Sequence, residues 1–186
     1  GRSPLSMAPL AWALEREGYR VVNWGYSSFS HTIPELGARL AGEVQRHENN
    51  GERRVHFVGH SLGNVVVRWV LAHDPPEDPG RVVMLAPPNG GSRSADRYAR
   101  WLGWLLPPLR ELQTSEGSTA RTLGLGEAVE VGVIAGLYDG KVSVAETHLD
   151  GERAHIVVPS AHSFIMVRSD VIRLTVRFLR EARFTE

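Results

Sequence analysis

The chain has 186 residues, which fits one domain that buries roughly 70% of the surface exposed by its unfolded form. Its 21 Lys and Arg residues balance its 21 Asp and Glu residues, so no net charge attracts nucleic acid or an anionic membrane. It contains no cysteine, which excludes disulfides and thiol chemistry. No apolar run reaches the roughly 18 residues of a membrane span, and no signal-peptide pattern opens the sequence. We expect a soluble protein, cytoplasmic or secreted, without stable membrane insertion.

Short apolar strands alternate with helices along the chain. A first helix, capped by Ser3 or Ser6, is predicted to end at Gly18. The other predicted helices cover about 34–49, 62–71 and the residues from 169 onwards. The predicted strands are 19–24, 55–58, 81–86, 129–135 and 154–158. Strands of this continuous apolar kind predict a single α/β domain over 1–186, with three layers and a mostly parallel sheet covered by helices on both faces.

The stretch 87–126 breaks this alternation. It is rich in Pro, Gly and Ser and carries an apolar cluster that includes Trp101, Trp104 and Leu105. We interpret it as a lid or cap inserted over the site, with these three residues as candidate substrate-binding side chains for an acyl chain. Ordinary packing of an inserted helix explains the same cluster equally well.

The sequence Gly59-His60-Ser61-Leu62-Gly63 follows a short apolar strand and precedes an apolar helix. This is the context of a nucleophile elbow, in which Ser61 sits on a sharp turn at the carboxyl edge of a sheet and small residues two positions away leave it room. The backbone N–H of Leu62 would stabilise the oxyanion formed on the substrate carbonyl. We predict that Ser61 is the nucleophile and that His60 only shapes the elbow.

The acid and the base are expected later, each just after a strand. Asp139 follows the strand 129–135, and His162 follows the strand 154–158. Asp139 is the favoured acid over Asp150 and Asp96. His162 is the favoured base, because His148 falls in a predicted helix and His155 lies inside a strand.

Three segments carry a resemblance to α/β-hydrolase lipases and esterases, specifically the small bacterial lipase-like branch that also resembles PGAP-type deacylases. They are FVGHSLGNVVVRW, MLAPPNGGSRSADR and YDGKVSVAETHLDGERAHIVVPSAHSFIM. The resemblance covers essentially the whole chain and implies ester hydrolysis without a cofactor. It also implies an earlier strand, missing here, that ends in a loop supplying the second oxyanion donor, of which Gly1 or Arg2 is the expected remnant.

We therefore expect a serine hydrolase that cleaves carboxylic esters or lipids through an acyl-enzyme, with a small ester or lipid as its partner. The sequence leaves open whether water or another molecule accepts the acyl group, and it also leaves open the oligomeric state. A non-catalytic binding domain on the same fold is the alternative from another class. A metal site is not expected, since His31, His47, His56, His60 and His73 lack the close pairing with an acid that zinc hydrolases show.

Overall fold

The computed structural model describes residues 4–26, 31–51, 54–89 and 129–185. Its centre is a four-stranded sheet in the order β1-β2-β3-β4, and every neighbouring pair is parallel. The strands are β1 (Arg54–His60), β2 (Asp78–Leu85), β3 (Val131–Gly136) and β4 (Ala154–Val158). Because all four strands run in the same direction, their carboxyl ends meet at one edge of the sheet. The predicted parallel α/β architecture is confirmed.

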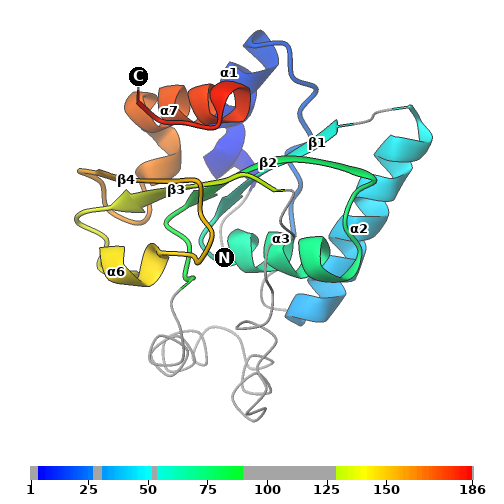
Figure 1. Ribbon diagram of the computed structural model, residues 1–186, viewed down its shortest axis with the longest axis horizontal. Coiled ribbons are helices and arrows are strands. Elements are labelled where there is room, and N and C mark those ends of the chain that lie inside the picture. The colour runs from blue at the N-terminus through cyan, green and yellow to red at the C-terminus, as the bar shows by residue number, and fades with distance from the viewer. Residues whose placement is uncertain (1–3, 27–30, 52–53, 90–128, 186) are drawn as a thin grey trace.

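Helices cover both faces of this sheet (Figure 1). On one face lie α1 (Ala8–Arg16) and α7 (Ser169–Glu181), and on the other lie α2 (Ile33–Asn49) and α3 (Leu62–His73). Alternate residues of β2 separate the two cores: Val83 and Leu85 pack on the α1 side, while Val82 and Met84 pack on the α2 side. Shorter turns complete the chain: η1 (Pro4–Met7), α6 (Val144–Thr147) and η3 (Ile165–Val167).

The start of α2 illustrates how the sequence defines an element. The Thr32 hydroxyl accepts a hydrogen bond from the Glu35 N–H at 3.3 Å, and the Glu35 carboxylate accepts one from the Thr32 N–H at 2.7 Å. This reciprocal capping box, with Pro34 in the first turn, satisfies two N–H groups at the helix start. The helix begins at Ile33, one residue before the predicted position.

Two local predictions are wrong. Residues 19–24 form no strand: they pair with none of the four strands of the described sheet, and together with β1 they line a cavity. Ser6 is not the cap of the first helix: it lies within η1, and the N-cap of α1 is Met7, with no side-chain hydrogen bond. Ser3 and most of the predicted insertion 87–126 lie outside the described residues. Within the described ranges, no helix has the length and apolar character of a membrane span.

Candidate active site

Ser61 lies between the end of β1 and the start of α3, at the carboxyl edge of the sheet. Its φ of 51° and ψ of −122° are unusual for a residue with a side chain. The Ser61 N–H donates to the Leu85 carbonyl at 3.0 Å, which continues the pairing of β1 with β2 into the turn. This strained strand-to-helix turn has the geometry of the predicted elbow.

Asn64 ties the elbow to the neighbouring strand. Its amide Nδ2 donates to the Ser61 carbonyl at 3.1 Å and to the Leu85 carbonyl at 3.2 Å. The side chain is fully buried, and a methyl group on Gly59 would approach its Oδ1 to 2.2 Å. Gly59 is therefore required by the packing of Asn64. Gly63 is different, since among the residues that the structure describes a methyl group there would meet only the Tyr26 hydroxyl at 3.6 Å, an ordinary contact. The expectation that both glycines are needed for space is thus wrong for Gly63.

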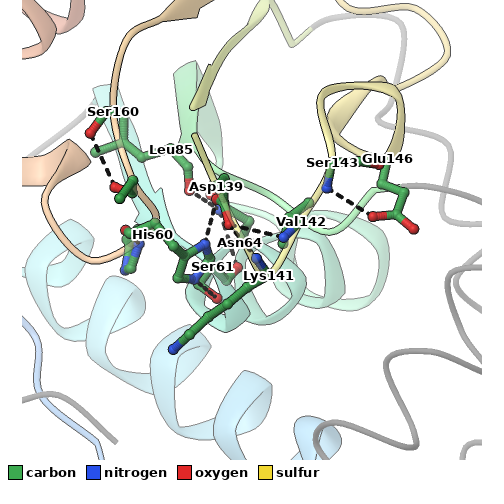
Figure 2. Close-up of polar contacts among 12 residues, drawn as sticks. His60, Ser61, Asn64, Leu85, Asp139, Lys141, Val142, Ser143, Glu146 and Ser160 are labelled. Atoms are coloured by element: carbon green, nitrogen blue, oxygen red, sulfur yellow. Dashed lines mark hydrogen bonds and ion pairs between the residues drawn. The ribbon is translucent and has the colours of Figure 1, made fainter. Parts of the chain in front are cut away.

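The structure brings the three predicted catalytic side chains together. Figure 2 labels two of them, Ser61 and Asp139. The His162 Nδ1–H donates to the Asp139 carboxylate at 2.6 Å. This fixes the tautomer and leaves Nε2 as an acceptor, 3.0 Å from the Ser61 hydroxyl. The His162 side chain is 7% exposed and that of Asp139 is 0% exposed, so bulk water is largely excluded from the contact between them.

Asp139 is held as a carboxylate by its surroundings. Burial by itself would raise its pKa, but hydrogen bonds from His162, Val142 and Lys141 and the charge of His162 outweigh burial, and the pKa lies below its ordinary value. The N–H groups of Lys141 and Val142 donate to Asp139 Oδ1 at 2.8 and 2.9 Å. The other oxygen, Oδ2, faces His162. One oxygen therefore anchors the carboxylate to its own loop while the other orients the imidazole.

Backbone hydrogen bonds join the loop that carries Asp139 to the loop that carries His162. The Leu137 N–H donates to the Val158 carbonyl at 2.8 Å, and the Tyr138 N–H donates to the Ser160 carbonyl at 3.1 Å. A methyl group on Gly136 would lie 2.6 Å from the Ser160 carbonyl oxygen. The close approach of these two loops therefore depends on a glycine at position 136.

His60 lies beside the predicted base, His162. Its Nε2–H donates to the His162 carbonyl at 3.0 Å, and the two imidazole rings are 4.9 Å apart. The side chain thus holds the backbone of the loop that carries His162, while the shaping of the elbow by His60 stays a prediction.

Leu62, the predicted oxyanion donor, is the first residue of α3. Its N–H belongs to the first helical turn, where N–H groups have no acceptor within the helix and the helix dipole favours negative charge. The other predicted donors, Gly1 and Arg2, and the predicted substrate-binding residues Trp101, Trp104 and Leu105 lie outside the described residues, as does Asp96.

A second polar cluster, which the sequence analysis missed, lies between α6 and β4. It contains His148, Glu152 and His155, whose potential ligand atoms lie within 4.8 Å of one another. His148 Nδ1 is 2.7 Å from the Glu152 carboxylate, and burial lowers the pKa of His155. The two imidazole rings are stacked at 3.9 Å with an angle of 16° between their planes. Because lone pairs in nearly parallel planes do not converge on one point, the cluster lacks the arrangement of a preformed metal site.

Sequence reasoning also missed the role of Asn64. In the sequence, Asn64 stands out only as a polar residue in the first turn of an otherwise apolar helix. Its spacing of three residues from Ser61 is the signal that places it over the turn, because residues i and i+3 share a helix face.

Known proteins are similar to this chain in part of its sequence and in its fold. Residues 25–85, a third of the chain that includes Ser61, match the family described as "Putative serine esterase (DUF676)". No curated protein matches the sequence. Similar solved structures include an esterase from Pyrococcus furiosus, with 18% identity and a TM-score of 0.66 over 96% of this chain and 77% of that one.

Two further structures extend the comparison. A pyrethroid hydrolase from Sphingobium faniae has 15% identity and a TM-score of 0.67, over 96% of this chain and 93% of that one. An enol-lactonase from Burkholderia xenovorans has 18% identity and a TM-score of 0.62, over 96% of this chain and 88% of that one. At these identities the likeness shows the fold, so the chain has the α/β-hydrolase fold. The family match and the fold together support a carboxylic ester hydrolase.

Proposed function

We propose that the chain hydrolyses carboxylic esters through an acyl-enzyme on Ser61, with His162 as the general base and Asp139 as the residue that orients it. The observation that carries the proposal is the continuous series of contacts from the Ser61 hydroxyl to His162 Nε2 at 3.0 Å and from His162 Nδ1 to Asp139 at 2.6 Å. A hydroxyl is a poor nucleophile until a base accepts its proton, and this geometry supplies one.

The first half of the reaction forms the acyl-enzyme. His162 Nε2 takes the hydroxyl proton as Ser61 Oγ attacks the ester carbonyl carbon. The carbonyl oxygen becomes an oxyanion, and the Leu62 N–H at the start of α3 is the donor that we propose stabilises it. His162 then gives its proton to the departing alcohol oxygen as the carbon–oxygen bond of the ester breaks.

The second half releases the acid. Water donates a proton to His162 Nε2 and attacks the acyl carbon, and a second oxyanion forms at the same place. Its collapse expels Ser61 Oγ, which recovers the proton from His162. The low pKa of Asp139 supports this cycle, because a carboxylate that stays ionised stabilises the imidazolium present in both halves.

Hydrolysis of p-nitrophenyl esters from acetate to palmitate, by the unmodified chain and by Ser61→Ala, tests the proposal. We expect activity that is lost in Ser61→Ala and kept in Ser163→Ala, a neighbouring serine that lines the same cavity. A fluorophosphonate probe should label the unmodified chain and Ser163→Ala but not Ser61→Ala. A chain that neither turns over esters nor reacts with the probe would instead fit a non-catalytic binding domain.

A further inference from the structure

The hydroxyl of Tyr26 lies against the start of α3, the helix that follows Ser61. Tyr26 and Ser61 line the same cavity of about 820 Å³. A methyl group on Gly63, the second residue of α3, would lie 3.6 Å from the Tyr26 hydroxyl oxygen. Because Cα–Cβ bonds in a helix tilt toward its amino terminus, this hydroxyl lies toward that end of α3. The N–H of Leu62, which we propose as an oxyanion donor, belongs to the same end of the helix.

Packing holds the ring of Tyr26 in this position. Its centroid lies 5.1 Å from the ring centroid of Trp24, with an angle of 30° between the two planes. Both rings pack against a buried apolar cluster that contains Ile33 and Leu36 of α2 and Val66 of α3. The helix that begins at the elbow therefore supplies part of the surface that supports Tyr26. A donor that is fixed before the reaction needs no reorganisation when charge develops on the substrate.

The protonation state of Tyr26 makes its hydroxyl a donor. Burial raises the pKa of Tyr26 to about 12, so the hydroxyl keeps its proton at any pH where His162 acts as a base. Within the described part of the chain, no residue forms a hydrogen bond with this hydroxyl. Its proton is therefore available to a molecule that enters the cavity. An oxyanion is a strong acceptor for such a donor, because hydrogen bonds to an ionised oxygen are stronger than those to a neutral one.

We propose that the Tyr26 hydroxyl donates a hydrogen bond to the oxyanion that forms when Ser61 attacks the ester carbonyl, beside the N–H of Leu62. The inference rests on the proposed function of Ser61. Tyr26 keeps its proton throughout, so the bonds that form and break remain those of the acyl-enzyme cycle. The carbonyl oxygen carries more negative charge in the transition state than in the bound ester, and the hydrogen bond is stronger there. Tyr26 therefore acts on kcat more than on KM.

Tyr26→Phe tests this role, because it removes the hydroxyl and keeps the ring that packs on Trp24. We expect kcat for p-nitrophenyl acetate to fall by about 10²- to 10³-fold, with little change in KM. Tyr26→Met lacks the same hydroxyl, fills the apolar site with a flexible side chain and should show the same loss, so the test does not depend on one variant. Tyr19→Phe is the matched control. Tyr19 lines the same cavity, but its ring contacts His56 in the first half of β1, and the variant should keep the rate of the unmodified chain.

Binding of phenyl trifluoromethyl ketone, followed by fluorine NMR, is a second measurement that needs no turnover. Ser61 adds to this ketone to form a stable oxyanion, so Tyr26→Phe should weaken binding by about the same factor as it lowers kcat/KM. Unchanged ketone binding and unchanged kcat in Tyr26→Phe, or a raised KM with unchanged kcat, overturn the inference.

Labelling of Ser61 by a fluorophosphonate probe separates this inference from the proposed function on which it rests. An unmodified chain that neither reacts with the probe nor turns over esters contradicts both. A Tyr26→Phe variant that is labelled and hydrolyses esters at the rate of the unmodified chain contradicts only the role of Tyr26.

Discussion

Ser61 holds a backbone conformation that costs a residue with a side chain about 1–3 kcal/mol and persists only where the surroundings fix it. Asn64 supplies part of that support through the Ser61 and Leu85 carbonyls. The residue types and their order along the chain predicted Ser61, Asp139 and His162 as the site. They did not predict Asn64, because an amide that bonds to backbone carbonyls leaves no motif beyond its spacing.

Asp139→Asn should lower kcat for p-nitrophenyl acetate by about 10³- to 10⁴-fold, as loss of the orienting carboxylate does in serine hydrolases of this type. The amide keeps the size of the side chain but no longer stabilises the imidazolium or selects the correct tautomer of His162. Initial rates near pH 8 measure the effect. Asp150→Asn, in the turn before β4, is the matched control and should keep the rate of the unmodified chain.

Asp139 should also make stability depend on pH. Its pKa in the folded chain lies below the ordinary value of about 3.9, so the folded state favours the ionised form. The resulting stabilisation is present above pH 4 and is lost as the pH falls through the folded pKa. Denaturant unfolding of the unmodified chain and of Asp139→Asn should show a difference in free energy that is larger at pH 7 than at pH 3. A difference that does not change with pH would contradict the lowered pKa.

Two glycines of the elbow should respond in opposite ways to alanine. Gly59→Ala brings a methyl group to 2.2 Å from Asn64 Oδ1 and should lower the free energy of unfolding by about 1–3 kcal/mol. Gly63→Ala has space and lies in the first turn of α3, where alanine is the better helix former, so it should be neutral or stabilising by up to about 1 kcal/mol. Thermal and urea unfolding of both variants provide the measurement, and equal losses would contradict the packing argument.

Among the elements, the strands β1 to β4 were predictable because each contains a short run of mainly apolar residues, as expected where helices cover both faces of a parallel sheet. Residues 19–24 have the same local pattern and yet form no strand. Strand formation requires a neighbour with which to exchange hydrogen bonds, and this segment pairs with none of the strands of the described sheet. Local sequence reports the tendency of a segment to be extended but not the presence of its partner.

The two site loops should separate if their closest contact is crowded. Gly136→Ala places a methyl group 2.6 Å from the Ser160 carbonyl oxygen, which must push the loop of Asp139 away from the loop of His162. We expect kcat to fall by about 10²-fold, since misplacement of a catalytic group by about 1 Å has an effect of that size. Gly140→Ala, where no atom of the described ranges lies within 4 Å of the added methyl group, is the control and should keep its activity. Unchanged kinetics in both variants would contradict the proposed dependence on loop contact.

At the scale of the whole molecule, Arg81 connects parts that are far apart in the sequence. It lies in β2, its Nε donates to the Glu130 carboxylate at 2.7 Å, and its Nη1 donates to the Leu179 carbonyl at 2.8 Å. The side chain thus joins the segment before β3 to the last turn of α7. No sequence pattern predicted this link, because its partners are 49 and 98 residues away.

Arg81→Met should lower the free energy of unfolding by about 1–2 kcal/mol, since it removes hydrogen bonds that involve a charge while keeping the apolar stem. Arg81→Lys should recover less than half of the loss, because a single ammonium cannot reproduce the two directions of a guanidinium. Arg54→Met is the matched control. Arg54 Nε lies 3.8 Å from the Asp78 carboxylate, and the Arg54 side chain is 65% exposed. Exposed ion pairs of this kind contribute little to the free energy of unfolding. Urea unfolding measures the free energy of unfolding of the three variants. An equal loss in Arg54→Met and in Arg81→Met would show that the link from Arg81 to α7 contributes no more to stability than an exposed ion pair does.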